Sequence, residues 1–197
     1  VQAYPKYGSE KKGLPTTYFL SIAQDKIRTH CELKHVEFIP LNDVNAFNLG
    51  NPLHGVAEGG MVFVQTPKTS PEEVWAEIPP MPQSIIRDKQ LRVLALDSVK
   101  IAREVSRSPD LAQRMQGIVL LGVFLRVTPF EREMGLDDDQ LFTGVEKSLR
   151  KYFGNRGEEV IQDNLRAVRR GFTEVIEIPR EIIETGNSER SDLTVAS

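Results

Sequence analysis

Cysteine is nearly absent from this sequence: Cys31 is the single one among 197 residues. One cysteine excludes an internal disulfide, and the simplest interpretation is a reducing compartment, so we expect the cytoplasm. No stretch approaches the roughly 20 uninterrupted apolar residues that a membrane span needs. The N-terminal "VQAYPKYGSEKK" has no apolar core of the kind found in secretory signals. We therefore expect no membrane contact.

An excess of basic residues is also missing. Lysine and arginine total 25 against 28 aspartates and glutamates, which gives a formal net charge of −3. Because nucleic-acid binding usually requires a clustered basic face, we expect no nucleic-acid partner. The hydrophobic content of 40% and charged content of 27% are ordinary for a globular domain with a sizeable core.

Strands and helices are expected to alternate along the chain. Short apolar runs predict buried strands at Val36–Leu41, Gly59–Thr66 and Leu91–Asp97. Pro15–Ala23 and Ile27–Leu33 are expected to pair as a β-hairpin. Cap signals and helical patterning predict helices over 42–52, 70–79, 98–108, Asp110–Val127, 137–153 and 156–172. The alternation favours an α/β fold with a largely parallel sheet flanked by helices. A polar tail is expected from residue 179 to 197.

The stretch "RTHCELKHVEF" holds Cys31 between His30 and His35. Neighbouring residues on a strand point to opposite faces, so His30 and Cys31 are poorly placed to act on one point. No second cysteine supplies the paired spacing of a zinc site. We therefore expect structural roles for these residues and no metal site.

The loop "KYGSEKKG" contains Gly8, Ser9, Lys11, Lys12 and Gly13 directly before a predicted strand. Glycines allow backbone N–H groups to approach an anion, and lysines add positive charge, so phosphate contact is chemically sensible. A solvated turn explains the same residues. The spacing is not that of a P-loop.

Two further positions carry polar groups into apolar surroundings. Asp97 ends a predicted buried strand and Lys100 follows on the next helix, at the sheet edge where open α/β folds bind ligands. Asp97 is at least as well explained as the N-cap of that helix. Gln116 interrupts an apolar helix and indicates a packing contact, a subunit interface or a ligand. The alternative there is close helix approach at Gly117 and Gly122.

The order of several segments resembles one family. It is the gamma subunit, or equivalent internal domain, of the 2-oxoacid:ferredoxin oxidoreductases, which include pyruvate:ferredoxin oxidoreductase. The matching stretches, over about residues 4 to 172, are "YGSEKKGLPTTYFLSI", "GVAEGGMVFVQTP", "LRVLALDSVKIAREV", "RMQGIVLLGVFLRVTPF" and "VEKSLRKYFGNRGEEVIQDNLRAV". The resemblance implies a Rossmann-like three-layer domain over 1–178. Gamma domains usually open with a strand and a G-x-G-G-Q-G-type turn, and we expect that element to be missing here.

The resemblance also implies a reaction: oxidative decarboxylation of a 2-oxoacid on thiamine diphosphate, with electrons passing through iron–sulfur clusters to ferredoxin and the acyl group to coenzyme A. A [4Fe–4S] cluster needs about four thiolates, and this chain has only Cys31. Thiamine diphosphate, magnesium and the clusters are therefore expected on alpha, beta and delta-type partner subunits. This chain is expected to be inactive alone, with no catalytic residue and no cofactor of its own.

By the same resemblance, the domain helps to shape the coenzyme A side of the active site. Gly8, Ser9, Lys11, Lys12 and Gly13 fall on the family's basic loop, and Asp97, Lys100 and Gln116 fall on other family motifs. They are candidates for ligand-facing or interface positions. Two other functions stay open at this point: a stand-alone module that binds coenzyme A or a nucleotide, and a purely architectural subunit sealed by helix Asp110–Val127.

Overall fold

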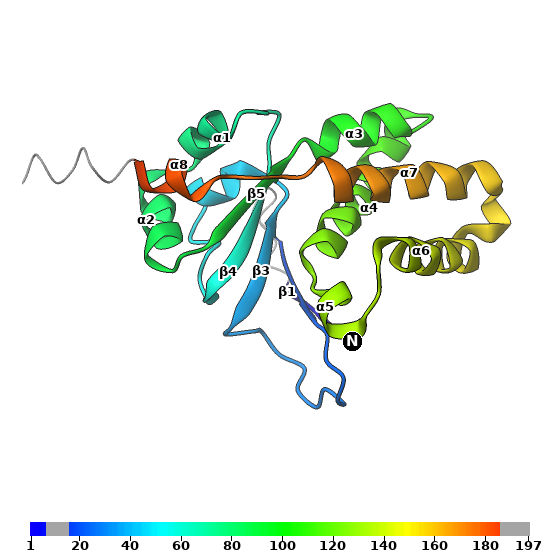
Figure 1. Ribbon diagram of the computed structural model, residues 1–197, viewed down its shortest axis with the longest axis horizontal. Coiled ribbons are helices and arrows are strands. Elements are labelled where there is room, and N and C mark those ends of the chain that lie inside the picture. Colours follow the sequence, from blue (N-terminus) through cyan, green and yellow to red (C-terminus); the bar gives the residue numbers. More distant parts are fainter. Residues whose placement is uncertain (7–15, 186–197) are drawn as a thin grey trace, which may run out of the picture. The chain divides into compact units, whose positions relative to one another are not determined.

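The protein is described by a computed structural model in which residues 1–6 and 16–185 are placed. Two compact units can be distinguished (Figure 1). The first comprises Val1–Val64, Glu72–Leu94 and the chain from Ile178 on, and the second comprises Gln65–Pro71 and Ala95–Glu177.

A four-stranded, mostly parallel sheet has the strand order β3-β4-β5-β6. Its strands are β3 (Val36–Leu41), β4 (Val56–Gln65), β5 (Arg92–Leu96) and β6 (Ile176–Glu177). Consecutive residues of β4 and β5 are buried, among them Val62, Phe63, Val93 and Leu94, so both faces of these strands are covered. The predicted α/β class with helices flanking a largely parallel sheet is confirmed. β3 is less enclosed than expected, since only Leu41 is buried in it.

Strand β4 begins at Val56, three residues before the predicted start at Gly59, so Gly59 lies inside the strand. Gly59 has a φ of +68°, which favours glycine, and its N–H donates to the Lys89 carbonyl at 2.8 Å. A Cβ at Gly60 would lie 2.9 Å from the Ala57 carbonyl oxygen. The parallel register with β3 shifts across these residues and becomes regular from Met61 on.

The first unit also contains three helices: α1 (Pro71–Glu77), α2 (Pro80–Asp88) and α8 (Arg180–Thr185). Arg87 of α2 joins two of them: its Nε donates to the Ile183 carbonyl at 2.6 Å, and its guanidinium lies 5.1 Å from the centre of the Trp75 ring. Ile183 is only 1% exposed. The prediction of a polar tail from 179 is therefore wrong for residues 180–185, whereas residues 186–197 lie outside the described part. The domain boundary at 178 stays a prediction.

The predicted β-hairpin has a different partner strand. β2 (Thr17–Ser21) pairs antiparallel with β1 (Gln2–Lys6), and not with Ile27–Leu33. The Ile27–Leu33 segment has no strand structure. The ring of His30 meets Tyr4 of β1 edge-on, with centroids 5.3 Å apart. Part of this segment thus lies against the face of the hairpin that carries Tyr4 and Phe19.

The second unit is mainly helical. Its elements are α3 (Ser98–Val105), α4 (Pro109–Val127), α5 (Phe130–Met134), α6 (Asp138–Phe153), the 3₁₀ turn η2 (Gly154–Arg156) and α7 (Glu158–Glu174). The predicted N-terminus of α6 is confirmed by a capping box between Asp137 and Gln140. In the first unit, the predicted short helix after β3 is a 3₁₀ turn, η1 (Val44–Asn48), capped by Asp43. Hydrogen bonds from Arg150 lower the pKa of Glu158 from 4.5 to about 2, so its carboxylate stays charged well into acidic solution.

Helices α4 and α7 approach at a pair of glycines. A Cβ at Gly122 would lie 2.1 Å from the Val168 carbonyl oxygen, and one at Gly171 would lie 2.0 Å from the Val119 carbonyl oxygen. The predicted close approach at Gly122 is confirmed. At Gly117 the prediction is wrong, because that residue is exposed and a Cβ there would meet nothing within 4 Å.

Candidate functional site

A polar cluster forms where β4 and β5 end and α3 begins. Gln65 is the last residue of β4, Asp97 follows β5, and Ser98 opens α3. The Gln65 amide bridges the other two: its Nε2 donates to Asp97 Oδ1 at 3.3 Å, and its Oε1 accepts from the Ser98 backbone N–H at 2.7 Å. This is the carboxyl end of a parallel sheet, the edge at which such folds place ligands.

Backbone N–H groups at the start of α3 are already hydrogen-bonded within the protein. Asp97 Oδ1 accepts the Lys100 backbone N–H at 2.9 Å, and the Asp97 carbonyl accepts the Ile101 N–H at 3.2 Å. The interpretation of Asp97 as an N-cap is therefore confirmed. The negative charge of Asp97 repels a phosphate group at this position. Its carboxylate oxygens can instead accept hydrogen bonds from hydroxyl or amide groups of a ligand. Lys100 is exposed, and the contact that joins it to the cluster is made by its backbone N–H.

Replacing Asp97 separates its cap role from any ligand role. Asp97→Ala is expected to lower the free energy of unfolding by about 1 kcal/mol, because the Lys100 N–H loses its acceptor. Asp97→Asn keeps an equally good cap and is expected to retain nearly wild-type stability. Urea titration of both variants measures this difference. Equal destabilisation by both substitutions would contradict the cap assignment.

Gln116 and the basic loop are not brought to this cluster by any described contact. Gln116 is half-buried on α4, and no hydrogen bond joins its side chain to another described residue. The loop residues Gly8, Ser9, Lys11, Lys12 and Gly13 lie outside the described residues. Their ligand-facing roles, like those of Asp97, Lys100 and Gln116, stay predictions.

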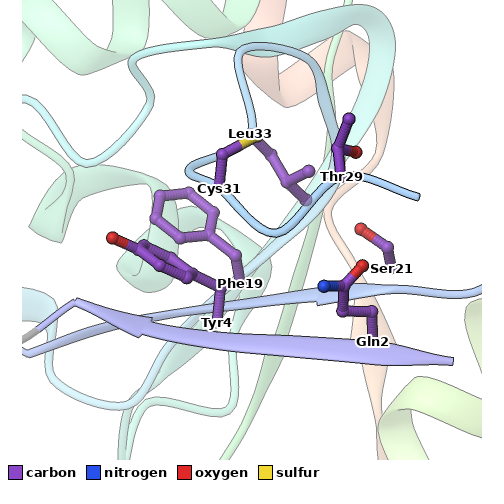
Figure 2. Close-up of a pocket in the computed structure, with 7 residues that line it drawn as sticks. All are labelled: Gln2, Tyr4, Phe19, Ser21, Thr29, Cys31 and Leu33. Carbon is purple, nitrogen blue, oxygen red and sulfur yellow. The ribbon is translucent and has the colours of Figure 1, made fainter. Parts of the chain in front are cut away.

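The Cys31 stretch lines a small hollow in the first unit. Figure 2 shows the side chains of Tyr4 and Phe19 on one side and of Cys31 and Leu33 on the other. Its volume of about 10 Å³ suits little more than a single water molecule. Within the described residues, no group of three or more His, Cys, Asp and Glu side chains is gathered closely enough to hold a metal ion.

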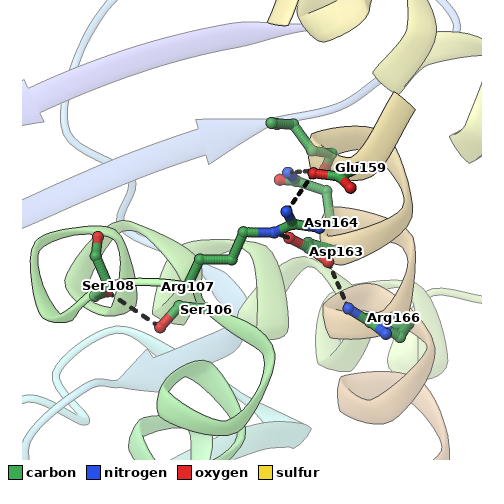
Figure 3. A network of polar contacts seen from close by, with 8 residues as sticks. Ser106, Arg107, Ser108, Glu159, Asp163, Asn164 and Arg166 are labelled. Atoms are coloured by element: carbon green, nitrogen blue, oxygen red, sulfur yellow. Dashed lines mark hydrogen bonds and ion pairs between the residues drawn. The ribbon is translucent and has the colours of Figure 1, made fainter. Parts of the chain in front are cut away.

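Sequence reasoning missed a network that joins the end of α3 to α7. Asp163, on α7, has a side chain only 10% exposed, and it accepts from Arg107 Nε at 2.8 Å (Figure 3). Arg166 donates to the other oxygen of Asp163, and Glu159 pairs with Arg107. The hydrogen bond to Asp163 is the main cause of the raised pKa of Arg107. The available signal was an aspartate at a buried position of an amphipathic helix, but the partner is 56 residues away.

Because Arg107 follows α3 and its partner Asp163 lies on α7, we interpret this network as a clamp between the two helices. Next to Asp163 on α7, Asn164 donates to the Val160 carbonyl at 2.7 Å. Among the helices of the described residues, none is long and apolar enough to cross a membrane.

Comparison with known proteins supplies the class. The family model described as pyruvate ferredoxin/flavodoxin oxidoreductase matches residues 1–174. The chain is 26% identical over 168 residues to a pyruvate-flavodoxin oxidoreductase of Trichormus variabilis, covering 85% of this chain and 13% of that protein. Against two further relatives of this long type, it spans 15% and 14% of their length. These long relatives thus contain this segment as one part of a much larger polypeptide.

Shorter relatives match nearly end to end. The chain is 26% identical to pyruvate synthase subunit PorC of Thermotoga maritima, covering 89% of this chain and 79% of the relative. It is 25% identical to a pyruvate/ketoisovalerate oxidoreductases common subunit gamma of Thermococcus litoralis, covering 89% and 81%. The crystal structure of the Thermotoga subunit shares the fold, with a TM-score of 0.60, 23% identity, and coverage of 90% of this chain and 81% of that one.

The fold is an α/β fold with a mostly parallel sheet flanked by helices. The chain belongs to the pyruvate ferredoxin/flavodoxin oxidoreductase family and is homologous to its gamma subunits.

Proposed function

We propose that this chain is the non-redox gamma-type subunit of an oxidoreductase that converts a 2-oxoacid to acyl-coenzyme A and passes electrons to ferredoxin. The observation that carries the proposal is the family match over residues 1–174, which includes nearly all of the described fold. The matches to proteins named as separate subunits, of which 79% and 81% are covered, support a gamma-type role.

The residues of this chain do not fit an iron–sulfur cluster. A cubane cluster requires about four thiolate ligands. The only cysteine is Cys31, which is exposed. In the described part of the chain it belongs to no group of three or more potential metal ligands. The proposal therefore assigns the clusters, together with thiamine diphosphate and magnesium, to companion subunits. No redox step is assigned to this chain.

The proposed contribution of this chain is to help bind coenzyme A. In this proposal, Lys100 provides a positive charge for a phosphate group of coenzyme A. The carboxylate of Asp97 accepts hydrogen bonds from hydroxyl or amide groups of coenzyme A. The cluster is held in place by Gln65, whose amide contacts both Asp97 and Ser98. Lys11 and Lys12 of the basic loop add charge in the same proposal.

Lys100→Met tests this role in the assembled complex. Loss of one phosphate contact is expected to raise the KM for coenzyme A by up to about tenfold, with kcat and the KM for the 2-oxoacid nearly unchanged. Lys147→Met, on the exposed side of α6, is the matched control and is expected to change neither constant. Initial rates of viologen-dye reduction over a range of coenzyme A concentrations give the answer. An unchanged KM in Lys100→Met would contradict the assignment.

The isolated chain provides the simplest test of the subunit role. Alone, it is expected to show no reduction of a viologen dye with any 2-oxoacid and coenzyme A. Turnover by the purified chain without companion subunits would overturn the proposal.

A further inference from the structure

The side-chain amide of Gln65 has one chemically possible orientation. The backbone N–H of Ser98 can only donate, so the atom that faces it at 2.7 Å is the amide oxygen, which also accepts from the Ser98 hydroxyl. The Nε2 group then donates to Oδ1 of Asp97 at 3.3 Å. A flipped amide would set two donors against each other at Ser98 and two acceptors at Asp97. Since Ser98 is only 4% exposed and all three residues belong to the second unit, the orientation is fixed within that unit.

The fixed amide decides which oxygen of Asp97 stays available. Oδ1 accepts from Gln65 Nε2 and from the Lys100 backbone N–H at 2.9 Å, and these two bonds use both of its lone pairs. Among the described residues, no hydrogen bond reaches Oδ2. The half-buried carboxylate of Asp97 thus has one occupied oxygen and one open oxygen. A single acceptor held in one place is the arrangement that discriminates for a ligand with a matching hydrogen-bond donor.

We propose that Gln65 is a positioning residue of the coenzyme A site, an inference that rests on the proposed function. Gln65 does not touch the substrate in this assignment. It holds Oδ1 of Asp97, so that Oδ2 accepts from a hydroxyl or amide group of coenzyme A. The open oxygen selects the neutral, donor-bearing part of coenzyme A, because a negatively charged acceptor repels the phosphate groups. Without the amide, only the hydrogen bond from the Lys100 N–H restrains the carboxylate.

Two substitutions separate the positioning of Asp97 from the support of α3. Gln65→Glu keeps an acceptor for both donors of Ser98 but replaces the donor to Asp97 with a like charge, whereas Gln65→Met removes every hydrogen bond of the amide. In the assembled complex, both variants are expected to raise the KM for coenzyme A about three- to tenfold, with kcat and the KM for the 2-oxoacid nearly unchanged. Gln65→Glu is expected to act at least as strongly as Gln65→Met. Initial rates of viologen-dye reduction measure these constants, and a raised KM in Gln65→Met alone would assign Gln65 to the support of α3 and refute the inference.

The same substitutions in an Asp97→Ala background show whether Gln65 acts through Asp97. Asp97→Ala alone is expected to raise the KM for coenzyme A, and each Gln65 substitution is then expected to add less than a further twofold, because no carboxylate remains to be positioned. A full further rise in that background would mean that the new side chain acts on the substrate directly. Gln83→Met is the matched control. Gln83 is a half-buried glutamine of α2 whose Nε2 donates to the Trp75 carbonyl at 2.9 Å, and its loss is expected to leave the KM for coenzyme A unchanged.

The outcomes separate this inference from the proposed function. A raised KM for coenzyme A in Asp97→Ala, together with a wild-type KM in both Gln65 variants, would overturn the inference and leave the proposed function intact. An unchanged KM in Asp97→Ala would contradict the proposed contribution of this chain to coenzyme A binding, and the inference with it.

Discussion

Gly122→Ala is expected to lower the free energy of unfolding by about 3 kcal/mol, among the largest single-residue effects in this chain. The new methyl group would lie 2.1 Å from the Val168 carbonyl oxygen and 2.8 Å from the Phe172 nitrogen, which are backbone atoms that no rotamer change can move. Helices α4 and α7 would have to separate, which would loosen the cluster formed by Leu125, Phe142, Val168 and Phe172. Urea denaturation followed by circular dichroism measures the loss.

Gly117→Ala is the matched control on the same helix. A Cβ at Gly117 has nothing within 4 Å, so the substitution removes only the entropic penalty of glycine in a helix. It is expected to stabilise the chain by about 0.5–1 kcal/mol. Equal effects of the two substitutions would mean that the helices do not meet at Gly122 and Gly171.

Asp163→Ala is expected to cost about 2 kcal/mol, because two charge-assisted hydrogen bonds are lost from a buried carboxylate. The estimate is moderate because the freed guanidinium groups remain hydrated: the side chains of Arg107 and Arg166 are 53% and 63% exposed. Glu159→Ala removes the outer partner of Arg107. Because the side chain of Glu159 is 75% exposed, this substitution is expected to lower the free energy of unfolding by less than about 1 kcal/mol. Thermal melts of both variants compare them. A larger loss in Glu159→Ala than in Asp163→Ala would contradict the clamp interpretation.

Local signals were sufficient for most of the sheet and the long helices. The apolar runs gave β4 and β5, and acidic residues at the start of α6, with Asp137 as cap, gave its position. The cap role of Asp97 was also readable, since an acceptor between a strand and a helix has a local function. These features depend on residues only a few positions apart.

The features that sequence reasoning missed depend on distant partners. The partner of β2 is β1, which precedes it across residues 7–15 and has a proline at position 5, an unusual residue in a strand. Helix α2 was not predicted; it has proline in its first turn, where proline is accommodated. Helix α8 is fixed by Arg87, 96 residues before Ile183. Gly171 and Asp163 likewise acquire their roles only when α7 meets its neighbours.

The central claim is that this chain works as a gamma-type subunit, and native purification tests it most directly. The chain carries a tag, is purified from the source cells under anaerobic conditions, and its companions are identified by mass spectrometry with assays for iron, sulfide and thiamine. The account predicts larger subunits that hold iron, sulfide and thiamine diphosphate, and a complex that reduces a viologen dye with a 2-oxoacid and coenzyme A. Recovery of the chain alone, free of iron and thiamine, would contradict the account.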